Sequence, residues 1–145
     1  MFTKILFPTD FSVRAQKVKT EILKMKDCGI KELVLLHVVD KKLFSYSPIS
    51  HELTINDMYV EEKAIDSAYK KLENLKAEFE NSGIKTKLDV VKGHPFEEIL
   101  VYADKEKATS IILGEKGLNE VDRLLIGSTA EKVVRKAGIP VIVIK

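Results

Sequence analysis

Short apolar runs alternate with amphipathic segments along almost the whole chain. Nearly continuous apolar stretches, of the kind found in strands buried on both faces, occupy residues 4–7, 32–39, 110–113 and 141–144. Between them, apolar residues recur every three or four positions, which is the period of a helix that packs one face on a core. Residues 84–90 instead alternate apolar and polar side chains, which predicts a strand at the edge of a sheet.

The resulting order, β-α-β-α-β-α-β-α-β, predicts an α/β fold with a doubly wound, Rossmann-like parallel sheet. Strands separated by helices of this length pair through right-handed crossovers, so that helices cover both faces of the sheet. The expected strand order is 3-2-1-4-5, and ligands of such sheets bind beyond the carboxyl ends of the strands, where the order reverses. The length of 145 residues predicts a single domain, residues 1–145.

Local signals place several boundaries of these elements. Ser12 precedes the first helical pattern and is a predicted N-cap, and Pro95 stands at the first position of the third helix. Residues 40–57 contain serines, a proline and no clean period. They predict one long loop, which is a candidate lid or a variable insertion.

The composition excludes several classes of function. Charged residues make up 32% of the chain but balance to a net charge of +2, which is too small for a nucleic-acid-binding surface. The first apolar run is too short for a signal peptide, and no stretch approaches the length of a membrane span. We therefore expect a cytoplasmic protein that binds neither nucleic acid nor membrane.

Glycines and hydroxyl residues gather between the fourth predicted strand and the last helix, at Gly114, Gly117, Gly127, Ser128 and Thr129. Glycines after a strand let the backbone turn its N–H groups toward an anion, and a helix amino terminus adds partial positive charge. The spacing matches neither a P-loop nor a dinucleotide-binding fingerprint. Two interpretations stay open: a phosphate-binding loop, or turns followed by a capping box made by Ser128 and Glu131.

Other polar residues have simpler interpretations. His37 lies inside a buried strand and is predicted to be a satisfied core histidine, and Cys28 is predicted to be a small buried apolar residue. Asp10 leaves the first strand, where a carboxylate can organise the following turn or bind a ribose hydroxyl; we favour the ribose. His51 has no second ligand at useful spacing, so the sequence predicts no metal site built by the protein.

The chain resembles the universal stress protein family over its whole length. The resemblance is carried by the motifs "ILFPTDFS", "LLHVVD", "KGHPFEEI", "GEKGLNEVDRLLIGSTAEKVV" and "GIPVIVIK". It implies a doubly wound α/β fold, a homodimer and, in one branch of the family, bound ATP. The glycine motif of the ATP-binding branch is met at Gly114, Gly117, Gly127 and Ser128.

The same resemblance implies a role for each site residue. Pro8, at the end of the first strand, leads to Thr9 and Asp10, which with Val38 would flank adenine and ribose. Leu113 would line the base. The phosphates would be held by Gly117, Gly127, Ser128 and Thr129. Glu115 departs from the family pattern, which commonly has a small polar residue there, and a carboxylate aimed at a triphosphate would repel it.

Two functional classes follow from these observations. The first is an ATP-binding regulatory protein of the stress response, with at most slow ATP hydrolysis, no catalytic residue assigned, and room for a magnesium or manganese ion carried by the phosphates. The second is an interaction module of the same fold in which the glycines serve only the turn. In both, the protein partners are unidentified.

The last predicted strand, "VIVIK", suggests how two copies would associate. In the order 3-2-1-4-5 this strand has one neighbour, and residues 141–144 contain no charge or proline to protect the open edge. Antiparallel pairing with the same strand of a second chain would satisfy its backbone groups under two-fold symmetry. The alternative is that the last helix or the long loop covers this edge.

Overall fold

Strands and helices alternate in the computed structural model, which describes residues 2–41, 55–115 and 126–145. The strands are β1 (Lys4–Pro8), β2 (Glu32–Asp40), β3 (Thr86–Gly93), β4 (Ser110–Gly114) and β5 (Val141–Ile144). The helices are α1 (Val13–Lys24), α2 (Ile55–Asn81), α3 (Pro95–Lys105) and α4 (Ser128–Lys136). This is the predicted succession of elements.

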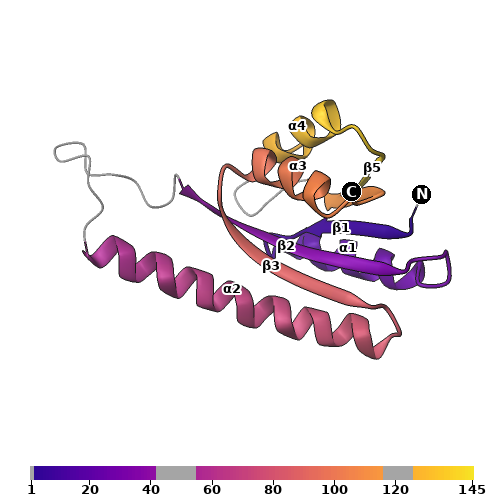
Figure 1. Ribbon diagram of the computed structural model, residues 1–145, viewed down its shortest axis with the longest axis horizontal. Coiled ribbons are helices and arrows are strands. Elements are labelled where there is room, and N and C mark those ends of the chain that lie inside the picture. Colours follow the sequence, from indigo (N-terminus) through magenta and orange to yellow (C-terminus); the bar gives the residue numbers. More distant parts are fainter. Residues whose placement is uncertain (1, 42–54, 116–125) are drawn as a thin grey trace.

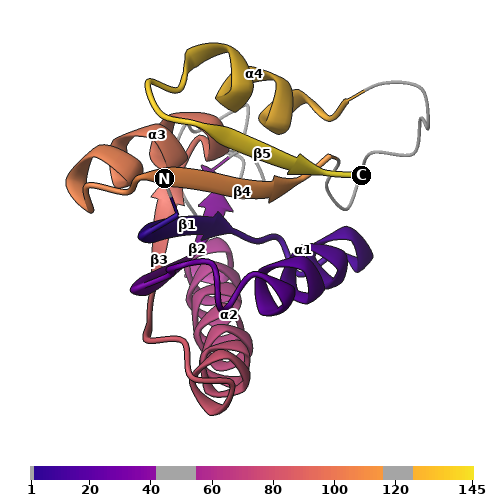
Figure 2. The ribbon, with the colours of Figure 1, turned by 90° about the vertical axis from the view of Figure 1, so that its right-hand side faces the viewer.

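The strands form one parallel sheet in the order β3-β2-β1-β4-β5, as predicted. The chain builds β1, β2 and β3 toward one edge and then returns to add β4 and β5 on the other side of β1 (Figure 2). The order therefore reverses between β1 and β4, and their carboxyl ends mark the place where ligands bind in sheets of this type.

Alternate residues of the strands build two cores, one on each face of the sheet. Ile5 and Phe7 of β1 join the core under α1 and α2, whereas Leu6 joins the core under α3 and α4 (Figure 1). Because both faces are covered, the central strands need apolar residues at every position. This is the reason for the continuous apolar runs of the sequence.

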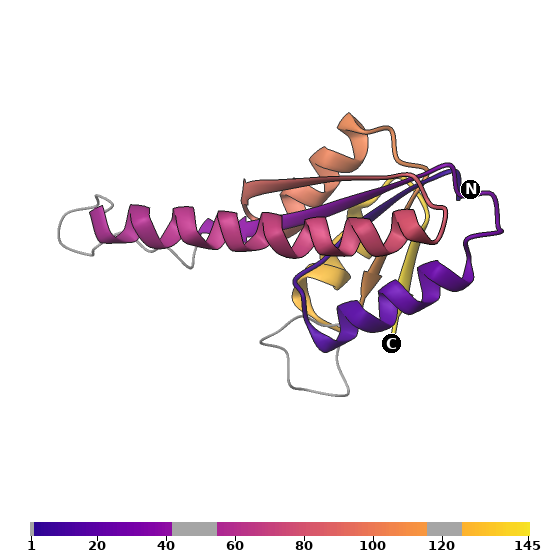
Figure 3. The ribbon, with the colours of Figure 1, turned by 90° about the horizontal axis from the view of Figure 1, so that it is seen from below.

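The loop predicted between the second strand and the second helix is shorter in the structure than the sequence indicates. Strand β2 continues to Asp40 and α2 already begins at Ile55, so the prediction of a loop over residues 40–57 is too long. The first turns of α2 extend past the ends of the strands, where Met58 and Tyr59 are exposed (Figure 3). A helical segment that packs on no sheet has no reason to show an apolar period. Residues 42–54, and with them the lid hypothesis and His51, lie outside the described residues.

Capping residues behave largely as the sequence indicates. The Ser12 hydroxyl accepts a hydrogen bond from the Ala15 N–H at 3.3 Å, and Pro95 is the first residue of α3.

The prediction that Cys28 is buried is wrong, because this residue is exposed. Helix α1 ends at Lys24, so Cys28 lies in the following turn, where its N–H donates to the Met25 carbonyl at 2.8 Å.

The two edges of the sheet differ in chemistry. On β3, the Asp89 carboxylate accepts hydrogen bonds from Tyr102 of α3 at 2.9 Å and from Tyr69 of α2 at 3.4 Å. Both helix layers therefore reach this edge. On β5, all four residues of the strand are half-buried and aliphatic. The predicted edge position of the alternating strand is confirmed for β3.

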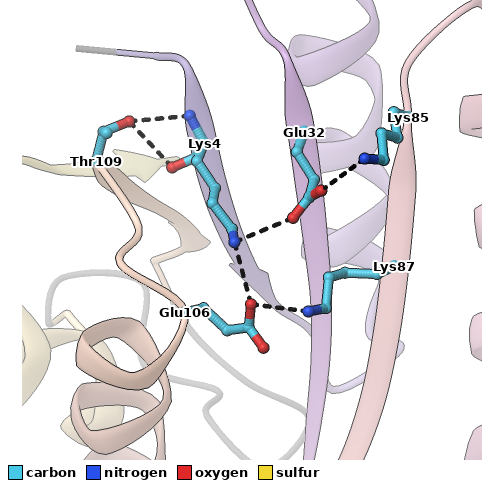
Figure 4. A network of polar contacts seen from close by, with 6 residues as sticks. All are labelled: Lys4, Glu32, Lys85, Lys87, Glu106 and Thr109. Carbon is cyan, nitrogen blue, oxygen red and sulfur yellow. Dashed lines mark hydrogen bonds and ion pairs between the residues drawn. The ribbon is translucent and has the colours of Figure 1, made fainter.

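Charged side chains join β1, β2, β3 and the C-cap of α3 at the amino-terminal end of the strands (Figure 4). The Lys4 ammonium lies 3.1 Å from both Glu32 Oε1 and Glu106 Oε2. Lys87 approaches the same Glu106 oxygen at 2.9 Å, and Lys85 approaches Glu32 at 3.4 Å. This network lies at the end of the sheet opposite to the strand ends where a ligand is expected.

The described part of the chain contains no helix with both the length and the apolar character needed to span a membrane. It also contains no group of three or more histidine, cysteine, aspartate or glutamate residues arranged to hold a metal ion.

Candidate functional site

The candidate site lies at the carboxyl ends of β1 and β4. Leu6 pairs with Ile111 in the parallel register, so the ends of these two neighbouring strands face the same edge of the sheet. Leu113 and Gly114 close β4, and Pro8 closes β1. Thr9 and Asp10 directly follow Pro8. Residues near the beginning of the chain and residues of the glycine motif therefore lie at the same edge of the sheet.

The turn between β1 and α1 is held by hydrogen bonds from its own side chains. The Thr9 hydroxyl accepts from the Phe11 N–H at 3.1 Å, and Asp10 Oδ1 accepts from the Ser12 N–H at 3.0 Å. Phe11 has a φ angle of 63°, which is uncommon outside glycine and needs such support. Asp10 thus organises the turn, which is the first of the two roles that its position suggested.

His37 of β2 contacts this turn from the side. Its Nδ1 atom lies 2.8 Å from the Thr9 carbonyl oxygen, and its ring lies against the Phe11 ring with centroids 4.7 Å apart. Burial is the main cause that lowers the pKa of His37, and Lys71 acts in the same direction; the Thr9 hydrogen bond and the charge of Asp10 oppose them.

His37 is therefore satisfied, as predicted, but it is half-buried beside Thr9 rather than enclosed in the core. Sequence reasoning missed this connection to a site residue. The one available signal was a polar side chain directly before Val38, within residues 33–39, which are otherwise apolar. Val38 itself is half-buried and packs against the core under α3 and α4.

The connection from β4 to α4 is closed by backbone hydrogen bonds. The Glu115 N–H donates to the Ile144 carbonyl of β5 at 2.9 Å, and the Gly127 N–H donates to the Glu115 carbonyl at 2.8 Å. Gly127 therefore lies beside Glu115, the residue that follows Gly114 at the end of β4. Gly117 lies outside the described residues.

Helix α4 begins at this point with Gly127 as its N-cap. Its backbone angles, φ −63° and ψ 152°, suit any residue, so the glycine is not required by conformation. Gly127 itself makes no side-chain hydrogen bond to the helix. Ser128 is already the first helical residue, so the predicted capping box on Ser128 is wrong by one position; Glu131 pairs instead with Arg135.

The amino terminus of α4 fits a bound phosphate group. The first amides of a helix have no partner within the helix and carry partial positive charge. Here the N-cap has no side chain to approach them, whereas in α1 the Ser12 hydroxyl fills that role. Gly127 is buried, Thr129 is half-buried and Ser128 is exposed.

Comparison with known proteins identifies the family. The sequence model described as "Universal stress protein family" matches residues 1–145. The chain belongs to the universal stress protein family. Among its relatives, universal stress protein MJ0577 of Methanocaldococcus jannaschii is 33% identical over 155 aligned residues, covering 100% of this chain and 96% of the relative. The solved structure of MJ0577 has a TM-score of 0.88 at 34% identity, covering 100% of this chain and 96% of that one.

More distant universal stress proteins share the fold. The universal stress protein from Archaeoglobus fulgidus solved in complex with dAMP has a TM-score of 0.62 at 21% identity, with 100% of both chains covered. A universal stress protein solved in complex with cAMP has a TM-score of 0.68 at 17% identity, covering 99% of this chain and 96% of that one. At these identities the likeness establishes the sheet and its helices.

Proposed function

We propose that this universal stress protein is a regulatory protein of the stress response that binds an adenine nucleotide, with ATP as its ligand. The observation that carries the proposal is the start of α4, where the N-cap is a buried glycine that has no side chain to occupy the space beside the first amides of the helix. These amides lie at the strand ends where the order of the sheet reverses.

Residues from the two ends of the chain would contact different parts of the nucleotide. Gly127, Ser128 and Thr129 would hold the phosphates, joined by Gly114 and Gly117 of the same motif. The turn at Thr9 and Asp10 would meet the ribose, and the base would lie near Val38 and Leu113. A magnesium or manganese ion would arrive with the phosphates rather than in a site made by the protein.

Nucleotide complexes of relatives support the choice of ligand class. One member of the fold was solved with dAMP and another with cAMP, and both ligands contain adenine and a phosphate. ATP is the finer choice, and it rests on the glycine motif of the sequence. Hydrolysis would be slow, because no catalytic residue is assigned.

The test is direct. Protein purified without added nucleotide is denatured, and the extract is separated by chromatography to look for adenine nucleotides. Calorimetric titration with ATP, AMP and GTP then measures affinity, for which we expect a dissociation constant for ATP on the order of micromolar, about −8 kcal/mol. Absence of both released nucleotide and binding heat would favour an interaction module that uses the glycines only for its turn.

We also propose that two copies pair through β5. The carbonyls of Pro140 and Ile144 accept hydrogen bonds from the β4 side, at 3.0 Å from the Ile111 N–H and 2.9 Å from the Glu115 N–H. Residues two apart in a strand direct their backbone groups the same way, so Val141 and Val143 direct theirs toward the open edge. A second β5 strand, antiparallel to the first, would satisfy them.

The contrast between the two edges favours β5 for this contact. Edge β3 carries lysines and Asp89, and tyrosines from both helix layers bond to that carboxylate. Charge and cover of this kind protect an edge against pairing. Among the described residues, β5 presents an aliphatic edge with neither device within residues 141–144.

A further inference from the structure

Strand β2 holds Thr9 by both of its backbone polar groups. The Thr9 N–H donates to the Leu36 carbonyl at 2.8 Å, and the Thr9 carbonyl lies 2.8 Å from Nδ1 of His37. The first bond continues the regular ladder between β1 and β2. The second is made by a side chain, and it holds the backbone directly after β1 ends at Pro8.

The chemistry of this contact defines the tautomer of the ring. A carbonyl oxygen only accepts hydrogen bonds, so Nδ1 of His37 carries the hydrogen. Burial is the main cause that lowers the pKa of His37 and so favours the neutral ring, whereas the Thr9 hydrogen bond and the charge of Asp10 raise that pKa. His37 therefore donates from Nδ1 to the Thr9 carbonyl.

The turn beyond Thr9 depends on the same ring. The Phe11 ring lies against His37, and the ammonium of Lys71 lies 5.1 Å from the centre of the Phe11 ring. Helix α2 thus reaches the turn through Lys71, and β2 reaches it through His37. Between these contacts, Thr9 and Asp10 accept hydrogen bonds from the turn itself, so their positions follow from where the ring places Phe11 and the Thr9 carbonyl.

We propose that His37 is a positioning residue for nucleotide binding, because its Nδ1–H fixes the backbone at Thr9 and Asp10 in the place where the ribose is received. This inference rests on the proposed function. His37 acts through Thr9 and Phe11 and not by touching the phosphates, whose proposed contacts come from α4. The proposal therefore requires a donor at the position of Nδ1, and it requires nothing of Nε2.

Three substitutions separate a donor at this position from simple occupation of space. His37→Asn places an amide N–H close to the position of Nδ1, whereas His37→Gln carries its amide farther out, close to the position of Nε2. His37→Leu fills part of the space and donates no hydrogen bond. We expect His37→Asn to bind ATP within about threefold of wild type, and the other two variants to bind about tenfold more weakly or worse, as the loss of one buried hydrogen bond implies.

Calorimetric titration with ATP and urea unfolding are measured on the same preparations. If the wild type does not bind ATP, the proposed function fails, and this inference fails with it. If the wild type binds and all three variants match it, only the positioning role is overturned. Equal weakening of His37→Asn and His37→Gln would overturn the role of the Nδ1 donor. If His37→Leu does not fold, the comparison of His37→Asn with His37→Gln still decides the question. Urea unfolding shows whether these two variants are equally stable, so that a difference in ATP affinity between them can be assigned to the position of the donor.

Discussion

The backbone N–H of Gly127 donates a hydrogen bond to the carbonyl of Glu115 at 2.8 Å. Glu115 in turn donates its own N–H to Ile144, so the end of β4, the end of β5 and the start of α4 are tied together. One residue thus connects the proposed phosphate site to the strand through which two copies are proposed to pair. Both proposals can be tested by substitutions within this small region.

Replacing Gly127 by valine should abolish ATP binding without unfolding the protein. The backbone angles of Gly127 suit valine, so the added bulk at a buried position, and not strain, would keep the phosphates from the helix amides. We expect affinity to fall at least a hundredfold, about 2.7 kcal/mol, in calorimetric titration. Gly138→Val is the matched control: Gly138 is exposed near the other end of α4 and has open space around its Cβ position, so affinity should be unchanged. Equal affinities of the two variants would contradict the phosphate site.

Replacing Glu115 by serine should tighten ATP binding by about tenfold, equivalent to roughly 1.4 kcal/mol. The backbone of Glu115 is hydrogen-bonded to Gly127, the N-cap of α4. A carboxylate there would repel a triphosphate and would itself be attracted to the positive end of the helix dipole. Titration in low and high salt provides the control, because a gain of electrostatic origin must shrink as salt increases. Unchanged affinity at low salt would mean that the side chain of Glu115 faces solvent.

Replacing Val143 by proline should give a folded monomer. The N–H of Val143 points to the open edge of β5, so its loss removes a bond between copies and leaves the ladder to β4 intact. Light scattering at tens of micromolar protein should report a dimer for the wild type and a monomer for the variant.

The neighbouring substitution Ile142→Pro is the control for that experiment. Ile142 directs its N–H toward β4, so proline there should destabilise the fold itself in thermal unfolding. A wild-type protein that is monomeric at this concentration would refute the β5 interface.

Replacing Glu106 by glutamine should destabilise the protein by about 1–2 kcal/mol at neutral pH. The hydrogen bond from Lys87 is the main cause that lowers the pKa of Glu106, and Lys4 adds to it, while partial burial opposes both. A lowered pKa in the folded state means that the unfolded chain binds more protons in acid. This stabilisation is therefore present above about pH 4.5 and lost as the pH falls through the folded pKa.

Urea unfolding at pH 7 and at about pH 3.5 checks this prediction. The difference between wild type and Glu106→Gln should shrink at the lower pH, because more of Glu106 is protonated there, and the protonated side chain is neutral and nearly the same shape as glutamine. Glu73→Gln, on the exposed side of α2, should change stability little at either pH. A difference for Glu106→Gln that is the same at both pH values would assign the effect to packing and not to charge.

The strand order was predicted from the general topology of doubly wound sheets. The sequence alone determined which segments form buried strands and which face of each helix packs on the sheet. These properties depend on burial, and burial leaves a period in the sequence: Leu6 and Phe7 are both apolar because both faces of β1 are covered. Ser12 and Pro95 could be placed for a similar reason, since a helix start depends on a few adjacent residues.

Only the tertiary structure decided which residue caps α4, where α2 begins and what His37 contacts. Gly127 is the N-cap of α4, and its N–H bonds to Glu115, twelve positions earlier in the chain; no local pattern encodes that bond. The start of α2 projects past the sheet, so no core imposed a period on it. His37 meets Thr9 across 28 positions because β1 and β2 pair in one particular register. Hydrogen bonds between distant segments depend on the packed arrangement of the strands, which the local pattern of apolar residues does not specify.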